Sequence, residues 1–231
     1  MKKTIVMALS GGLDSATLLA TLLRDGHVVH CCLFFYGSKH NQYELESANK
    51  VVNHYAALKY PVTSHYFDIS EVMKNFNSAL MKSNSQEIPE GAYNDETMKL
   101  TVVPGRNLIF ASIMAGLAES INANAIALGV HAGDHHIYPD CRPEFIKALD
   151  SVIYLSSDRK VEVICPFANI DKIGILQIGM SMNVPYHLTR TCYKDQVKSC
   201  GKCGSCTERL EAFATLGLID PIQYETENTE I

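Results

Sequence analysis

The stretch Ser10-Gly11-Gly12-Leu13-Asp14-Ser15 decides the fold of this chain. The apolar run 4–9 before it has the length of a buried strand. The leucine-rich run 18–23 behind it is spaced for one face of a helix that stops at Gly26. A glycine-rich turn between a strand and a helix directs free N–H groups and the positive end of the helix dipole to one point. The two glycines allow an oxyanion to approach the backbone closely, so the stretch predicts an anion-binding loop in an α/β fold.

The composition of this loop separates it from two other phosphate-binding loops. It has no Gly-Lys-Ser/Thr, so it is not a Walker A loop, and it lacks the Gly-x-Gly-x-x-Gly of dinucleotide folds. Its Ser-Gly-Gly-x-Asp-Ser resembles the loop of the pyrophosphatase-loop ATPases residue for residue. That resemblance implies that ATP is cleaved between its α and β phosphates and that an acid or carbonyl substrate receives AMP. The expected ATP contacts are Leu9, Ser10, Gly11, Gly12, Leu13, Asp14, Ser15, Ala16, Thr17, Leu18 and Leu19.

Length and composition limit the class of protein. A chain of 231 residues with 47% hydrophobic residues can bury a substantial core in one large domain, with or without a small appendage. The net charge of −5 and the lack of a Lys/Arg block weigh against a nucleic-acid partner. The apolar run 4–9 is too short for a signal peptide core, and no run approaches the ~18 residues of a membrane span. We therefore expect a soluble, cytoplasmic protein with no membrane partner.

Strand and helix patterns alternate along the rest of the chain. Further strands are predicted at 28–35, 62–67, 125–130 and 161–165, and further helices at 41–58, 107–121, 143–154 and 171–182. This order favours an α/β fold with a doubly wound, mostly parallel five-stranded sheet and right-handed crossovers. The expected fold is Rossmann-like, of the adenine nucleotide alpha hydrolase type, with its ligand crevice at the carboxyl end of the first strand.

The segment 70–100 lacks such a pattern. It is polar, rich in Asn and Ser, and interrupted by Pro89-Glu90-Gly91. A long irregular segment inside a compact domain suggests a lid or a substrate loop rather than core. A solvated insertion fits the same composition equally well.

Four of the eight cysteines lie close together in the sequence, at Cys192, Cys200, Cys203 and Cys206. Four soft thiolates are enough to close a tetrahedral zinc site. A [4Fe–4S] cluster needs the same number of ligands and uses similar spacings. The absence of a following Cys-Pro and the glycine-rich surroundings favour one structural zinc ion.

The end of the chain is expected to carry this metal. Ser205 and Glu208 have the spacing of a capping box for a last helix that ends near Gly217. We therefore divide the chain into a nucleotide-binding α/β domain at 1–186 and a zinc-binding C-terminal segment at 187–231.

A second polar constellation follows the irregular segment. Arg106 carries a rigid fork of donors suited to a phosphate or a carboxylate, and Asn107 is placed to cap the following helix and direct Arg106 into the crevice. The connection 131–145 is dense in polar groups and follows a predicted strand, where ligands bind in this fold class. The candidate substrate contacts are Tyr36, Arg106, Asn107, His131, Asp134, Tyr138, Asp140 and Arg142.

Taken together, these motifs resemble the QueC family, the 7-cyano-7-deazaguanine synthases of the queuosine pathway. The resemblance runs over residues 3 to 220 and rests on the first loop, Tyr36-Gly37, 103–107, 138–145 and the cysteine-rich end. It implies an ATP-dependent ligase that converts 7-carboxy-7-deazaguanine and ammonia to the nitrile, through an adenylated acid and an amide. It also implies one zinc ion on the four cysteines and a homodimer.

The chain departs from the family pattern at two places. Leu13 stands where many members have Gln, and His131 stands where many have an acidic or other polar residue. These departures leave open an enzyme that stops at 7-amido-7-deazaguanine. Two further alternatives stay open independently of them, a tRNA-thiolating relative and a non-catalytic nucleotide sensor.

The chemistry requires activation of a carboxylate, which is a poor electrophile. Adenylation makes its oxygen a leaving group, and the helix N-terminus with Mg²⁺ would stabilise the departing pyrophosphate. Asp14 is the candidate Mg²⁺ contact, and Arg106 is expected to bind a phosphate or the substrate carboxylate. Ammonia then attacks directly, so no Ser or Cys nucleophile is needed.

Overall fold

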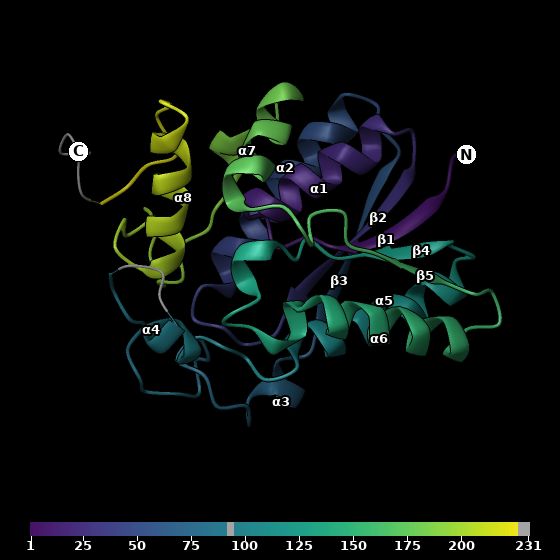
Figure 1. Ribbon diagram of the computed structural model, residues 1–231, viewed down its shortest axis with the longest axis horizontal. Helices are drawn as coiled ribbons and strands as arrows, with labels where there is room; N and C mark the ends of the chain where they lie inside the picture. Colours follow the sequence, from purple (N-terminus) through teal and green to yellow (C-terminus); the bar gives the residue numbers. More distant parts are fainter. Residues whose placement is uncertain (92–94, 226–231) are drawn as a thin grey trace.

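The computed structural model describes residues 1–91 and 95–225 and contains a five-stranded sheet in the order β3-β2-β1-β4-β5 (Figure 1). Every neighbouring pair of strands is parallel. The strands are β1 (Thr4–Ala8), β2 (Val28–Phe35), β3 (Val62–Asp68), β4 (Ala125–Ala127) and β5 (Glu162–Ile164). The predicted doubly wound α/β fold is confirmed.

Helices cover both faces of the sheet. The α-helices are α1 (Leu13–Arg24), α2 (Asn41–Ala57), α3 (Ser70–Met73), α4 (Asp95–Lys99), α5 (Arg106–Ser120), α6 (Pro143–Ser156), α7 (Lys172–Ser181) and α8 (Gly204–Thr215). Short 3-10 turns lie at Ala132–Asp134, Pro139–Cys141 and Tyr186–Leu188. Helices α1, α2 and α7 lie on one face, α5 and α6 on the other, and α8 stands at one end of the sheet (Figure 1). Among the described residues, none of the helices is both long and apolar enough to cross a bilayer.

Alternate residues of the central strands form two apolar layers. In β1, Ile5 and Met7 pack with the α1 side of the molecule, while Val6 packs with the α5 side. All three side chains are completely buried. A strand buried on both faces reads as a continuous apolar run, which is why β1 and β2 were recognisable from the sequence.

The strand order reverses between β1 and β4. From β1 the chain winds through β2 to β3 on one side, and β4 and β5 extend the sheet on the other. The carboxyl ends of β1 and β4 therefore form the crevice in which ligands bind in such sheets. Strand β4 is shorter than predicted because the chain beyond Ala127 leaves the sheet and lines that crevice.

The segment 70–100 is partly core, which corrects the prediction that it lies outside the core. Met73, Leu80, Met81 and Met98 are buried in the apolar layer that also contains residues of α5. Polar residues separate these side chains at irregular intervals. The sequence therefore shows no helix or strand periodicity from which their burial could be predicted. The part at 92–94 lies outside the described residues.

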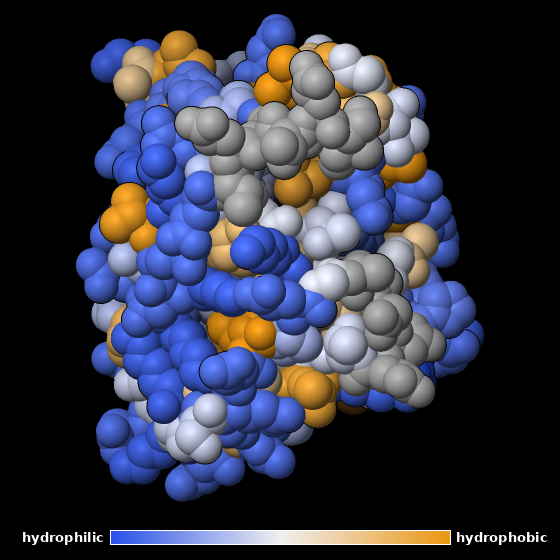
Figure 2. Space-filling view, turned by 90° about the vertical axis from the view of Figure 1, so that its left-hand side faces the viewer, coloured by the Kyte–Doolittle hydropathy of each residue, from blue (hydrophilic) through white to orange (hydrophobic). Residues whose placement is uncertain are grey.

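The C-terminal segment packs α8 against α7, and the face on which α8 lies is mostly hydrophilic (Figure 2). Ala212 and Phe213 of α8 belong to the same apolar cluster as α1 and α7. The predicted capping box is wrong. Cys203 is the N-cap residue, so Ser205 lies inside the first turn, and the Glu208 carboxylate pairs with Lys172 instead.

The anion loop is fixed against α2 by Gly11. This residue has φ of +76°, and a Cβ on it would lie 2.4 Å from the Ala48 backbone nitrogen. Gly12 has an ordinary φ of −79° and lines the crevice. The expectation that both glycines serve the approach of an anion therefore needs correction, because Gly11 is required for packing.

We predict that Gly11→Ala destabilises the protein far more than Gly26→Ala. Gly26 also has a positive φ, +83°, but open space surrounds its Cβ position. Both variants suffer the left-handed backbone penalty of about 1–2 kcal/mol, and only Gly11→Ala adds a clash with the α2 backbone. Urea unfolding measures the difference, and equal losses of stability would contradict the packing role.

Candidate functional site

One pocket opens at the carboxyl ends of the strands, and we divide its lining residues by their chemistry into two halves. The first half contains the anion loop and charged side chains: Ser10, Gly12, Asp14, Ser15, His131, Asp134, Lys172, Arg190 and Glu208. The second half is aromatic and contains Phe34, Tyr36, Arg106, Phe110, Tyr138 and Tyr193. A pocket that joins polar and flat apolar walls suits a ligand pair with a polyphosphate and a planar ring.

The anion loop is held by its own serines. The hydroxyls of Ser10 and Ser15 lie 3.1 Å apart, and the Gly12 N–H donates to Ser10 Oγ at 3.3 Å. Ser15 donates to the Gly12 carbonyl oxygen. No side chain of the described residues caps α1 at Gly12. The helix N-terminus is therefore available to an anion, as the sequence predicted.

Lys172 joins two acidic side chains at this loop. Its Nζ lies 2.7 Å from Asp14 Oδ2 and 3.1 Å from Glu208 Oε2. Burial disfavours the charged form of Asp14, but electrostatic interactions, led by the positive charge of Lys172, outweigh burial and lower the pKa of Asp14. Burial raises the pKa of Glu208, and the Lys172 charge opposes this only in part. Asp14 is thus kept ionised at the N-terminus of α1.

His131 lies between two of the carboxylates. Its Nε2 is 3.4 Å from Asp134 Oδ2 and 3.9 Å from Asp14 Oδ2. Its Nδ1 accepts a hydrogen bond from the Gly133 N–H, so the neutral ring carries its proton on Nε2 and directs it toward the acids. His131 therefore places a hydrogen-bond donor between two acidic side chains.

The aromatic half surrounds Arg106. Phe34 and Phe110 stack with ring centroids 4.0 Å apart, and Tyr36 meets Phe110 edge-on. Burial disfavours the charge of Arg106, but the electrostatic influence of Tyr36 and its neighbours outweighs burial and raises the Arg106 pKa. Burial also raises the pKa of Tyr36 to about 12, so its hydroxyl stays protonated near neutral pH. Arg106 is thus a permanent cation beside a flat apolar surface.

Asn107 does not cap α5, which corrects the prediction. Helix α5 begins one residue earlier, at Arg106, and its N-cap is Gly105. The Asn107 side chain instead donates to the Asp140 carbonyl oxygen and to Cys141 Sγ. The Asp140 carboxylate accepts the Asn107 N–H at 2.8 Å, so an acidic group from another loop occupies the N-terminus of α5.

The other candidate residues divide between the pocket and its surroundings. Of the predicted ATP contacts, Leu9, Ser10, Gly12, Asp14 and Ser15 line the pocket. Outside its lining lie Gly11, Leu13, Ala16, Thr17, Leu18 and Leu19. Of the predicted substrate contacts, Tyr36, Arg106, Asn107, His131, Asp134 and Tyr138 line the pocket, and Asp140 and Arg142 do not. Arg142 is exposed, and its Nε donates to the His135 carbonyl oxygen.

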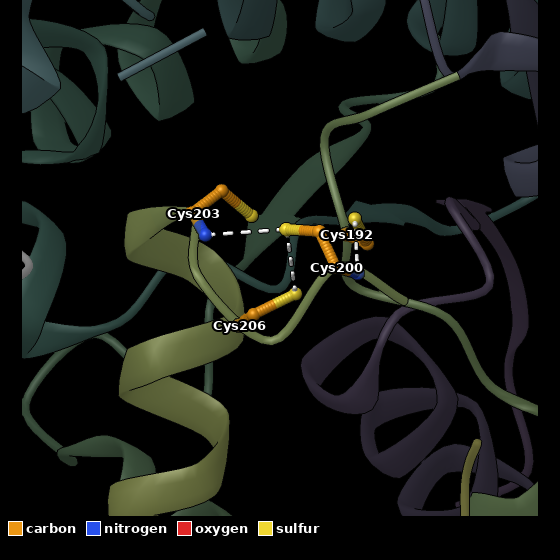
Figure 3. Close-up of side chains that lie close together, drawn as sticks. All are labelled: Cys192, Cys200, Cys203 and Cys206. Carbon is orange, nitrogen blue, oxygen red and sulfur yellow. Dashed lines mark hydrogen bonds between the residues drawn. The ribbon is translucent and has the colours of Figure 1, made fainter. Parts of the chain in front are cut away.

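The four clustered cysteines form a second site beside the pocket (Figure 3). Their sulfur atoms all lie within 4.8 Å of one another, and the Sγ atoms of Cys200 and Cys206 are 3.9 Å apart. Zn–S bonds of about 2.3 Å place tetrahedral sulfurs about 3.8 Å apart, so the cluster fits a four-thiolate metal site.

Backbone N–H groups surround two of these sulfurs. The Cys203 N–H points at Cys200 Sγ at 3.2 Å, and the Cys200 N–H points at Cys192 Sγ (Figure 3). The Lys202 N–H also points at Cys200 Sγ, at 3.4 Å. Hydrogen bonds from the neighbouring thiols and from the Lys202 amide lower the pKa of Cys200. These donors favour the thiolate form that a metal ion requires.

Sequence reasoning missed three charged residues of the pocket: Lys172, Arg190 and Glu208. Lys172 is the first residue of α7, and 158 positions separate it from Asp14. Helix α7, whose start the sequence predicted at residue 171, has Asp171 as its N-cap, and the side chain of this residue accepts from the Gly174 N–H. That cap located the helix start, but no local pattern indicated that the next side chain reaches the first loop.

Comparisons with known proteins agree with this architecture. NMN synthetase from Francisella tularensis has a TM-score of 0.50 at 12% identity, covers 98% of this chain and 90% of that chain, and shows a likeness of fold. A 7-cyano-7-deazaguanine synthase from Pseudoalteromonas atlantica is 42% identical, over 97% of this chain and 100% of that protein. A protein of the same name from Caldicellulosiruptor saccharolyticus is 46% identical over 96% of each. Since the family model described as "Queuosine biosynthesis protein QueC" also matches residues 4–217, the chain belongs to the QueC family.

Proposed function

We propose that this protein is an ATP-dependent ligase that converts 7-carboxy-7-deazaguanine and ammonia to 7-cyano-7-deazaguanine. The observation that carries the proposal is that the anion loop and the aromatic side chains around Arg106 line the same pocket. The names of the related proteins identify the nitrile as the product. A deazaguanine is a planar ring, and its carboxylate is a poor electrophile that needs activation.

In this proposal the two halves of the pocket bind the two substrates. The loop from Ser10 to Ser15 and the N-terminus of α1 bind the polyphosphate of ATP. The aromatic half binds the deazaguanine ring by stacking, and Arg106 binds its carboxylate or the α-phosphate. The two reactants are then held in one pocket, where the carboxylate can attack the α-phosphorus.

The reaction consists of two dehydrations at one carbon. The carboxylate attacks ATP, pyrophosphate leaves, and ammonia displaces AMP to give the amide with loss of a proton. The amide oxygen then attacks a second ATP and pyrophosphate leaves; loss of AMP and of both N–H protons gives the nitrile. The helix N-terminus stabilises the charge that develops on the leaving pyrophosphate.

The acidic side chains of the pocket fit a Mg²⁺ ion that would accompany ATP. Asp14 Oδ1 is buried and has no hydrogen-bond partner among the described residues. Asp134 and Glu208 line the same half of the pocket, and their excess negative charge would repel a bare polyphosphate. Oxygen ligands of this kind suit Mg²⁺. A bound Mg²⁺ ion would supply charge neutralisation to the phosphates.

We predict that purified protein supplied with 7-carboxy-7-deazaguanine, ammonia and ATP produces the nitrile with about two AMP per product. Each oxygen of the original carboxylate has to leave as part of AMP. Mass spectrometry of the product, together with quantification of AMP, provides the measurement. Added 7-amido-7-deazaguanine should also be converted.

Accumulation of the amide with one AMP per product would replace the nitrile assignment by an amide synthetase. Release of no pyrophosphate in the presence of all three substrates would indicate a nucleotide sensor.

We predict that Gly12→Ala lowers the rate of pyrophosphate release at least about tenfold, because a Cβ enters the space above the anion loop. The backbone of Gly12 suits any residue, and the nearest atoms to its Cβ position are 3.4 Å away, so the fold should survive. Gly116→Ala is the matched control, because nothing lies near that Cβ position in α5. Equal activity of both variants would show that the loop does not bind the reacting phosphates.

We further propose that Cys192, Cys200, Cys203 and Cys206 bind one structural zinc ion and that 187–231 is a zinc-binding segment attached to the nucleotide-binding domain at 1–186. The four buried thiols fill a tetrahedral site, so no position is open for a substrate. Closed thiolate sites contribute directly to folding, on the order of 10 kcal/mol in small zinc modules.

We predict that Cys203→Ala yields protein without zinc that is insoluble or partly unfolded. Cys165→Ala, which changes a cysteine outside the cluster, should keep one zinc ion per chain. Metal analysis by mass spectrometry and thermal unfolding measure both effects. Stoichiometric iron and sulfide in the wild type would instead assign a [4Fe–4S] cluster.

The proposal also includes a cytoplasmic homodimer that acts on small molecules and binds no nucleic acid. The dimer is implied by the resemblance to the QueC family, and sedimentation of the purified protein measures it. The net charge of −5 supports the absence of a nucleic-acid partner.

A further inference from the structure

Arg190 is a buried cation in the pocket that the proposed mechanism does not use. Its side chain is almost completely enclosed, with 7% of the residue exposed. Its terminal nitrogens donate to backbone carbonyl oxygens of Lys194, Gln196 and Val197 at 2.7–3.0 Å. Its Nε–H is buried and has no acceptor among the described residues. The guanidinium therefore has neutral partners and one unused donor.

The other buried cations of the first half of the pocket and its surroundings are paired with acids. Lys172 lies between Asp14 and Glu208, and Arg209 makes two hydrogen bonds to the Asp220 carboxylate. Within the described ranges, no carboxylate lies within ion-pair distance of Arg190. A buried charge without a counter-ion raises the free energy of the folded state. A bound anion would remove this cost.

Arg190 is also fixed to the anion loop. Its backbone N–H donates to the Gly11 carbonyl oxygen at 2.9 Å, and its carbonyl oxygen lies 3.4 Å from the Cβ position of Gly12. The guanidinium is stacked on the Tyr43 ring of α2, 4.5 Å from its centroid. The guanidinium is therefore held in one position by these contacts, in a residue whose backbone touches the Gly11–Gly12 turn.

We propose that Arg190 is a further polyphosphate-binding residue, which supplies a fixed positive charge to the phosphates bound by the Ser10–Ser15 loop. The anion loop itself contains no lysine or arginine, and the charge of Lys172 is already balanced by two carboxylates. Arg190 thus provides the uncompensated positive charge on this side of the pocket. The inference rests on the proposed function in taking a nucleoside triphosphate as the ligand.

The test measures binding of magnesium pyrophosphate by titration calorimetry, without turnover. Arg190→Met removes the charge but keeps a long apolar stem against Tyr43. We expect it to weaken pyrophosphate binding about tenfold or more, the size of one charge-assisted interaction. The KM for ATP should rise with it, and the KM for the deazaguanine should not change. Arg159→Met is the control, because it removes the same charge from an exposed position and should bind like the wild type.

Arg190→Lys separates charge from structure. This variant keeps the positive charge but loses the guanidinium hydrogen bonds to the three carbonyl groups. Thermal stability should therefore fall, while pyrophosphate affinity stays within about threefold of the wild type. This variant also provides the test if Arg190→Met fails to fold.

Wild-type affinity in folded Arg190→Met would overturn the inference, as would a tenfold loss of affinity in folded Arg190→Lys. The proposed function fails separately. A wild-type protein that binds pyrophosphate through Arg190 but forms no nitrile or amide would reject the ligase and retain this binding residue.

Discussion

The close contact between the Gly11 turn and the backbone of α2 is the constraint on which the site depends. A Cβ at Gly11 would lie 2.4 Å from the Ala48 nitrogen, so the turn can sit there only without a side chain. The Gly11 carbonyl oxygen on the same turn accepts the Arg190 N–H. The turn is thereby fixed between α2 and the C-terminal segment. Its remaining open side, with Gly12 and the N-terminus of α1, faces the pocket.

The charges around this turn divide into balanced and unbalanced groups. Lys172 is balanced by Asp14 and Glu208, and it keeps Asp14 ionised at the start of α1. Arg106, in the aromatic half, interacts most strongly with the tyrosines Tyr36, Tyr193 and Tyr138 and less strongly with Asp140. The pocket lining therefore contains cations in both of its halves, Arg106 in the aromatic half and Lys172 and Arg190 in the other, and the carboxylates Asp14, Asp134 and Glu208. Such an arrangement suits a reaction in which a polyphosphate and an organic acid meet.

The cysteine cluster contributes to the same site through α8. Cys203 and Cys206 lie at the start of that helix, and one turn further it carries Glu208 into the pocket. Arg209 on the next position is buried and bonded to Asp220 and Thr189, which fixes the helix against the preceding loop. Gly91 of the irregular segment bonds to the Lys202 carbonyl oxygen. A structural metal at these cysteines would thus hold the Glu208 carboxylate at the pocket without itself contacting a ligand.

The sequence by itself determined the anion loop, the alternation of strands and helices, the family resemblance and the four-cysteine cluster. These features are encoded by spacing between near neighbours, which fixes dihedral preferences, hydrophobic faces and metal ligands locally. Only the tertiary structure decided that Gly11 packs on α2, that α5 begins at Arg106 without an Asn107 cap, and that 70–100 contributes methionines to the core. It also brought Lys172, Arg190 and Glu208 to a loop near the start of the chain. The physical reason is that such contacts depend on how α7, α8 and the cysteine-rich loop pack against the sheet. The hydrophobic periodicity of a short segment carries no information about that packing.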